Sequence, residues 1–252
     1  MTSALRALAR LVGAAAVAAA VVLVAPSSAR AGDGALTGDL SRLDEHEIER
    51  RYAFIRERLD QGKRGAQLWQ YGFTSAWGFG VAVGAAQAST TDNKVTRISG
   101  IVTSTKAAGG VAKLLWSPHP ARHGAEDLEG LPSETREERI ERLAAAEALL
   151  REVEIRAESR LGWKRHAYNV AANLVGGAVI VGVGGFDRAW DNALTSFGVG
   201  VVAGEVMVFA EPSRGADDAA DYRRRFVEMP RNPEVSWRLV PKHDGFAFQV
   251  EF

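Results

Sequence analysis

Histidine and carboxylate side chains gather in one loop, where their types match those of a metal site. His119, His123, Glu126 and Asp127 lie within nine residues, and imidazole and carboxylate groups ligate zinc and similar ions. Histidines in a polar loop are, however, more often solvated than metal-bound. His119 and His123 are therefore weak candidates, and we predict that the chain binds no metal and no cofactor.

Glycines occur twice in the pattern Gly-x-Gly-x-x-x-Gly, beginning at Gly78 and at Gly198. The spacing is similar to that of a dinucleotide-binding loop, which needs a preceding strand and a helix N-terminus at the phosphates. Both patterns instead lie inside apolar runs with helical periodicity. We interpret these glycines as helix-packing positions.

Other catalytic equipment is sparse. The sequence has no Gly-x-Ser-x-Gly elbow, Walker loop or His-Glu-x-x-His helix, and it has no cysteine for thiolate chemistry or disulfides. The 252 residues carry 31 Lys plus Arg and 31 Asp plus Glu, a balance that argues against a nucleic-acid partner. We therefore expect a protein that is not an enzyme and does not bind nucleic acid.

The N-terminus has the features of an export signal. Arg6 and Arg10 precede an apolar run over 11–26, and Ala29-Arg30-Ala31 supplies the small residues that signal peptidase reads. We predict a cleaved signal peptide over 1–31, with an uncleaved anchor as the alternative. The mature chain is then exported to the periplasm or to a cell-envelope membrane.

The first segment after the leader is amphipathic. Apolar residues recur at three-to-four-residue spacing between Asp39 and Gln61, and the opposite face is dense in charge. This pattern predicts a helix that ends at Gly62. Residues 65–91 then contain no ionisable acid or base, which predicts an apolar environment.

Small residues recur every fourth position in this uncharged stretch and again in the next one. In an α-helix this spacing places them on one slowly drifting stripe, where a second helix can approach closely. We predict an antiparallel helical hairpin, with its turn at 91–93, that packs through Gly72, Ala76, Gly80 and Gly84 and through Gly100, Ser104 and Ala108.

A second hairpin is expected after a charged connector. Thr135 and Glu138 match a capping box that opens a helix running to about Leu161. The segment from Trp163 to Pro212 then repeats the features of the segment from Trp69 to Pro118: an uncharged stretch, a turn and a second apolar stretch that ends at a proline. Both intervals span 49 residues. This suggests an internal repeat, with small packing residues at Gly176, Gly200 and Gly204. A buried strand is the alternative for 174–183.

Charged residues interrupt the second and fourth predicted helices. Lys106 and Lys113 lie in the second and Glu205 in the fourth, and a charge inside a bilayer is costly unless it is paired. If the hairpins pack together, Lys106 and Glu205 are candidate partners in a buried ion pair. Membrane-embedded hairpins are slightly favoured over a compact water-soluble core.

The C-terminal tail changes to a period of two, which predicts a β-hairpin around a turn at 242–245. Its terminal aromatic strand also resembles those of outer-membrane barrels, but a barrel needs at least eight strands.

The fold class is therefore mainly α, with two glycine-striped antiparallel helical hairpins, two charged amphipathic helices and a C-terminal β-hairpin. The predicted segments are a signal peptide over 1–31, a leader and amphipathic helix over 32–64, hairpin 1 over 65–117, a polar loop and connector helix over 118–162, hairpin 2 over 163–212, and a linker and β-hairpin over 213–252.

Two functional hypotheses follow. The first is an exported, non-enzymatic envelope protein that associates with a membrane or with further copies of itself through glycine-mediated helix packing. The second is a soluble periplasmic bundle that binds a small apolar ligand lined by Trp69, Trp77 and Trp163. An outer-membrane barrel-like protein is the third alternative.

Overall fold

The computed structural model describes residues 36, 39–228, 236–242 and 245–251. The predicted signal peptide and most of the leader lie outside these residues. The described chain is mainly helical, as predicted. Its elements are η1 (Leu40–Arg42), α2 (Glu45–Thr90), α3 (Lys94–Trp116), η2 (Pro120–His123), α4 (Glu126–Glu129), α5 (Arg136–Ser159), α6 (Trp163–Gly184), α7 (Trp190–Phe209), α8 (Arg214–Tyr222), η3 (Arg223–Val227), β1 (Ser236–Lys242) and β2 (Gly245–Glu251).

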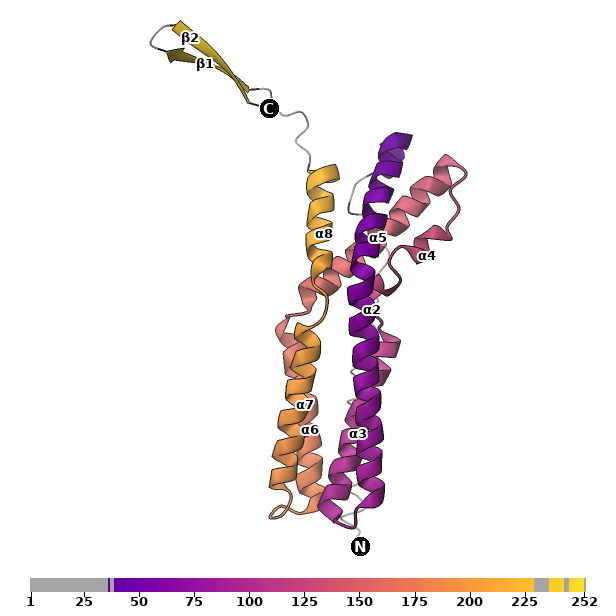
Figure 1. Ribbon diagram of the computed structural model, residues 1–252, viewed down its shortest axis with the longest axis vertical. Coiled ribbons are helices and arrows are strands. Elements are labelled where there is room, and N and C mark those ends of the chain that lie inside the picture. Colours follow the sequence, from indigo (N-terminus) through magenta and orange to yellow (C-terminus); the bar gives the residue numbers. More distant parts are fainter. Residues whose placement is uncertain (1–35, 37–38, 229–235, 243–244, 252) are drawn as a thin grey trace.

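One long helix, α2, organises the helical body (Figure 1). It starts at Asp44, whose side chain accepts a hydrogen bond from Glu47 N (2.7 Å), and it continues for 46 residues to Thr90. The prediction that Gly62 ends a first helix is therefore wrong. A glycine inside a helix costs about 1 kcal/mol relative to alanine. The parts of α2 before and after Gly62 pack against α5 and α3 respectively, and this packing outweighs that cost.

The N-terminal half of α2 belongs to a conventional hydrophobic core. Its apolar face contributes Ile48, Ile55 and Leu59, which pack with Leu143 and Leu150 of α5 in one cluster. The helix α5 begins with the predicted capping box, in which both reciprocal hydrogen bonds between Thr135 and Glu138 are present. We call this part, residues 39–64 together with 118–162 and 213–228, the head.

The C-terminal half of α2 pairs with α3, and α6 pairs with α7 (Figure 1). The two pairs meet mainly through α3, which packs against α6 and α7. Trp69 of α2 also reaches across, because its Nε1 donates to Met207 O of α7 (2.9 Å). We call these four helical segments, 65–90, 94–116, 163–184 and 190–209, the four-helix bundle.

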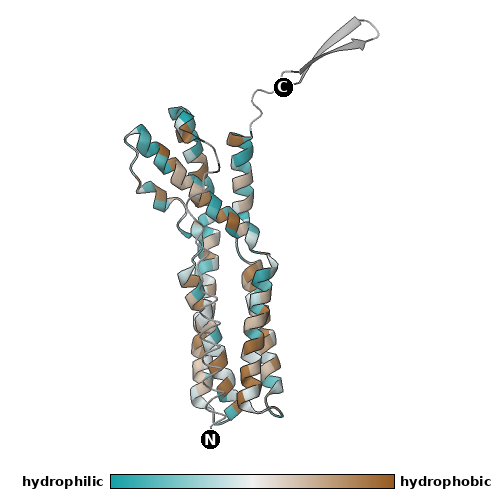
Figure 2. Ribbon diagram, turned by 180° about the vertical axis from the view of Figure 1, so that it is seen from behind, coloured by the Kyte–Doolittle hydropathy of each residue, from teal (hydrophilic) through white to brown (hydrophobic). Residues whose placement is uncertain are grey.

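The bundle and the head differ in the side chains that they expose. Among the described residues, all but two of the exposed large apolar side chains lie within 68–116 and 161–209; the exceptions are Ile155 and Val227. Figure 2 shows that hydrophobic residues are frequent along the ribbon of the bundle, whereas hydrophilic residues are more frequent in the head. The bundle's interior has only a small apolar cluster, centred on Val102, Ile180 and Val181.

The two hairpins are not equivalent position by position. Trp69 is 6% exposed within α2, whereas Trp163 is 74% exposed at the start of α6. Asn93 caps α3 by accepting from Thr96 N, while Asp191 and its neighbour Asn192 lie inside the first turn of α7. The equal intervals therefore do not mark matching sites. The strand alternative for 174–183 is also wrong, because these residues belong to α6.

The last two described elements are extended. β1 and β2 pair in antiparallel register, with Ser236 opposite Glu251 and Lys242 opposite Gly245.

Candidate functional site

Lys106 of α3 is bound inside the four-helix bundle. Its ammonium group donates to Asn173 Oδ1 of α6 (2.9 Å) and to the backbone oxygen (3.0 Å) and Oγ (3.1 Å) of Ser196 of α7. A lysine ammonium has three protons to donate, so these three acceptors satisfy it. The same residue thereby joins three of the four helices.

Two asparagines extend this network along α6. Asn173 Nδ2 donates to Asn169 Oδ1 (3.0 Å), and Asn169 Nδ2 donates to Glu205 Oε1 of α7 (2.9 Å). His166 Nδ1 lies 2.6 Å from the other carboxylate oxygen, Oε2. From Lys106 to Glu205 every hydrogen bond is donated in the same direction. We call these residues, with Ser196, the polar ladder.

The predicted ion pair between Lys106 and Glu205 therefore needs correction. Each is bound by other groups, and the side-chain amides of Asn173 and Asn169 connect them. Lys106 binds α6 at Asn173, whereas Glu205 binds it at Asn169, four residues earlier. The direct partner of Glu205 is His166.

Three of the predicted packing glycines make room for the ladder. A Cβ atom built on Gly200 would overlap with Asn173 Oδ1, and one built on Gly204 would overlap with Asn169 Oδ1. A Cβ on Gly176 would come within 3.1 Å of Lys106 Cδ. These glycines thus admit polar side chains, which differs from the close backbone contact expected for them.

The ladder occupies one end of the bundle. His166 and Glu205 lie at the end that adjoins the head, and Lys106 lies near the middle of α3. Beyond Lys106, toward the far turns, the interior is the apolar cluster that includes Val102 and Ile180. The polar contacts between the helices therefore lie in the half of the bundle next to the head.

The close backbone approach occurs between α2 and α3. A Cβ on Gly84 would lie 2.5 Å from Ser104 N and 2.7 Å from Gly100 O, and a Cβ on Gly100 would lie 2.7 Å from Ala88 N. Gly80 faces Ala107, whose Cβ would be 3.1 Å away. These positions support the contact expected of a small-residue stripe.

The outer members of the predicted stripe face away from the partner helix. Gly72, Ala76 and Ala108 are exposed, and nothing lies within 4 Å of a Cβ built on Gly72. A four-residue spacing drifts around a helix of 3.6 residues per turn. The contact consequently moves from Ala108 to Ala107, which is buried.

The metal candidates are not brought together. His119 is buried, and its Nδ1 accepts from Ala121 N (3.2 Å). His123 Nε2 accepts from Arg122 Nε (2.8 Å). Among the described residues, no group of three or more histidines and carboxylates could hold a metal ion. Burial, with a smaller contribution from the nearby Arg156, lowers the pKa of His119 to about 4.

A charged cluster joins the head to the bundle. Glu211, just after α7, is almost fully buried; Arg156 Nε donates to its Oε1 (2.6 Å), and Arg165 Nη1 donates to its Oε2. Arg156 also donates to Pro118 O (2.9 Å), beyond the end of α3. We call Glu211, Arg156 and Arg165, with the neighbouring Lys113, the junction cluster.

Our sequence reasoning missed the two asparagines of the ladder. Asn169 and Asn173 stand four residues apart in a segment, 167–186, that contains no charged residue. Residues four apart share one helix face, so this spacing was the available signal. Nothing in the sequence indicated that Ser196 would bind Lys106.

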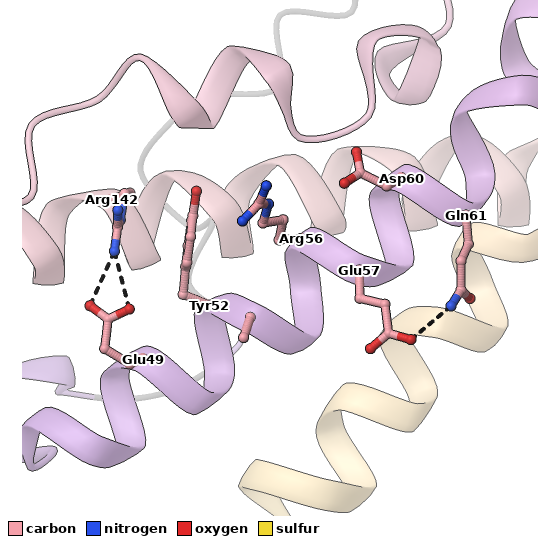
Figure 3. A pocket seen from close by; sticks show the side chains of 8 residues that line it. Glu49, Tyr52, Arg56, Glu57, Asp60, Gln61 and Arg142 are labelled. Atoms are coloured by element: carbon pink, nitrogen blue, oxygen red, sulfur yellow. Dashed lines mark hydrogen bonds and ion pairs between the residues drawn. The ribbon is translucent and has the colours of Figure 1, made fainter.

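A hollow of about 760 Å³ lies in the head, away from the ladder. Figure 3 shows its lining, with Arg142 donating to both oxygens of Glu49 and Gln61 donating to Glu57. The lining comes from α2 and Arg142 of α5; its charged groups on α2 are exposed, whereas the Arg142 side chain is largely covered.

Two described helical stretches, α6 and one within 190–227 that includes α7, are long and apolar enough to cross a membrane by length and composition. The uncharged part of α2, for which the sequence predicted an apolar environment, is not among these stretches. Its length suffices, but glycines and polar residues such as Gln67, Gln70 and Gln87 lower its hydropathy.

No family model, no curated protein and no solved structure matches this chain.

Proposed function

We propose that the chain is an exported, non-enzymatic envelope protein whose four-helix bundle lies in a membrane and holds the head at one surface. The observation that carries this proposal is that the bundle exposes large apolar side chains and binds polar ones between its helices. Large apolar side chains cover its outside, while a lysine, two asparagines, a histidine and a glutamate bind one another between the helices, where Asn173 is buried and the other four are half-buried. Such an arrangement suits a lipid solvent, in which polar groups must be satisfied within the protein.

The outward apolar side chains are spread over all four helices. An extended apolar surface of this kind on a protein in water would mark a binding face or an aggregation hazard. In lipid it needs no partner. The exposed members in α6 and α7 are Trp163, Tyr168, Val170, Leu174, Val175, Trp190, Leu194, Val199, Val202, Val206 and Phe209.

Aromatic residues mark both ends of the bundle. Trp116 and Trp163 are exposed at the head end, and Phe186 and Trp190 are exposed at the far end, where their rings meet edge to face. Between these ends α6 has 22 residues, or about 33 Å at 1.5 Å per residue. Aromatic belts at the edges of a hydrocarbon core about 30 Å thick are typical of membrane proteins.

The charges of α3 are compatible with a bilayer because of where they lie. Lys94 and Arg97 are in its first turn and Lys113 is in its last. Long basic side chains near helix ends can reach the polar interface. Lys106 alone lies near the middle, and it is hydrogen-bonded to Asn173 and Ser196.

The orientation follows from the predicted export signal. Translocation of the segment after residue 31 would place the head on the exported side and the turns at 91–93 and 185–189 on the opposite side. More lysines and arginines flank the head end than the far turns, and this charge bias by itself favours placing the head on the cytoplasmic side of the membrane. We propose the exported orientation because the first topogenic segment usually dominates.

The soluble ligand-binding alternative has less support. Of its three proposed lining residues, Trp69 and Trp77 both donate to Met207, to its backbone oxygen (2.9 Å) and its Sδ (3.4 Å), whereas Trp163 is exposed. The hollow of about 760 Å³ contains none of them.

Assembly of copies is part of the proposal. Gly72 and Ala76 lie on an outward face of α2, with open space beside Gly72. In a membrane, small residues on such a face let a second helix approach closely.

Cell fractionation tests the proposal. We expect the full chain to stay with membranes through an alkaline carbonate wash and to be released by detergent. Release by osmotic shock without detergent would contradict it and would favour a soluble periplasmic protein.

A further inference from the structure

We propose that the junction cluster binds the headgroup of an anionic phospholipid, with Lys113 and Arg165 as the groups that contact its phosphate. This inference rests on the proposed membrane location. It assigns a ligand to a cluster in which Arg156 and Arg165 are bound to Glu211 and Lys113 has no partner of its own among the described residues.

The junction cluster contains more positive than negative charge. Arg156 and Arg165 share the single carboxylate of Glu211, whose two oxygens are both occupied. Arg156 Nη1 also donates to Pro118 O and Ser117 O. The single negative charge of Glu211 is therefore shared by two arginines, and the cluster as a whole stays positively charged.

Lys113 is the third cation of the cluster. Lys113 lies in the last turn of α3, and its backbone oxygen accepts from Ser117 N. Arg156 donates to Ser117 O, so its side chain contacts the same end of α3, and it shares the carboxylate of Glu211 with Arg165. The Lys113 side chain has no hydrogen-bond or ion-pair partner among the described residues, and the residue is exposed. An anion placed here would offset a repulsion that the protein itself leaves in place.

Apolar side chains beside the cations favour a lipid over a free anion. Leu115 and Trp116 follow Lys113 on α3, Trp163 precedes Arg165 on α6, and Phe209 ends α7; all four are exposed. Lys164, also exposed, adds a further positive charge at this level. A phosphate held by the basic groups would leave its acyl chains against these apolar surfaces, at the depth where headgroups lie.

The test compares the full chain in nanodiscs of phosphatidylcholine alone and of phosphatidylcholine mixed equally with phosphatidylglycerol. Retention of the chain in the discs is scored first by flotation. We expect the anionic lipid to raise Tm for the wild type. Lys113→Gln should lose most of that rise and should bind phosphatidylglycerol about fivefold more weakly, as expected for one basic residue near an anionic surface.

Lys94→Gln is the matched control. Lys94 is also exposed and also without a partner among the described residues, but it lies at the opposite end of the same helix. This variant should keep the full rise in Tm, and Lys113→Arg should restore it.

A full rise in Lys113→Gln would overturn the inference. So would an equal rise produced by inorganic phosphate in phosphatidylcholine discs, which would indicate a site for free anions. A chain that inserts but shows no response to phosphatidylglycerol contradicts this inference alone. A chain that does not enter either disc contradicts the proposed membrane location.

Discussion

Lys106 and Glu205 are linked through two asparagine side chains and make no direct contact. Lys106 donates to Asn173, Asn173 donates to Asn169, and Asn169 donates to Glu205. Because all three bonds run in one direction, each polarises the next. A positive and a negative group are thus held apart inside the bundle by a chain of aligned amide dipoles.

This linkage predicts energetic coupling without contact. We expect Lys106→Met to lower the free energy of unfolding by about 2 kcal/mol, because it leaves three acceptors unpaired. In a double-mutant cycle with Glu205→Gln, the coupling energy should be about 1 kcal/mol. Repeating the cycle in an Asn173→Ala background should abolish it. Strict additivity in the wild-type background would show that the amides transmit nothing.

The glycines of α2 should differ sharply in their tolerance of a methyl group. Gly84→Ala places its Cβ against the backbone of Ser104 and Gly100, and we expect a loss of about 2 kcal/mol or more. Gly72→Ala meets open space and should stabilise the helix by about 0.5–1 kcal/mol. Denaturant titration in detergent measures both. Equal effects of the two substitutions would contradict the close contact of α2 with α3.

His119 should make the head less stable in acid. Its pKa is lowered from 6.5 to about 4 in the folded protein, so the unfolded chain binds more protons between these values. Stability contributed by His119 is therefore complete above pH 6.5 and falls as the pH drops toward 4, by up to about 3 kcal/mol.

His119→Asn is the appropriate variant for this measurement, because asparagine can still accept from Ala121 N. Its unfolding free energy, measured from pH 7 to pH 4, should fall less steeply than that of the wild type. Parallel curves would mean that His119 does not contribute to acid sensitivity.

Assembly predicts proximity between outward faces of α2 in neighbouring copies. Gly72→Cys should form disulfide-linked dimers in membranes under mild oxidation, since the natural chain has no cysteine to compete. Ser104→Cys serves as the control and should stay monomeric, because the Ser104 side chain faces α2 of the same chain, where its Oγ donates to Val81 O (3.2 Å). Monomers for both variants would remove the proposed contact at Gly72.

The sequence was sufficient to predict that the fold is mainly helical. Periodicity and turn residues also located α3 closely, since a turn predicted at 91–93 and a hairpin predicted to end at 117 compare with Lys94–Trp116. The capping box of α5 was equally clear, because its signal is local. The break at Gly62 was wrong because a glycine marks a local cost and the packing that offsets it is tertiary.

The candidate site was predictable only in part. The sequence indicated that Lys106 and Glu205 needed partners, since both lie in apolar segments. It did not identify those partners, because each depends on the relative rotation of α3, α6 and α7. The same rotation decides that Gly200 and Gly204 face asparagines, whereas Gly84 and Gly100 face backbone.

The most direct test of the membrane location is labelling of single cysteines introduced into the cysteine-free chain. Leu174→Cys and Val202→Cys lie on the outward faces of α6 and α7, and Glu152→Cys lies on the exposed surface of the head. A charged thiol reagent applied to opened membranes should modify Glu152→Cys readily and leave the two bundle cysteines unmodified until detergent is added. Equally rapid modification of all three without detergent would contradict a bundle surrounded by lipid.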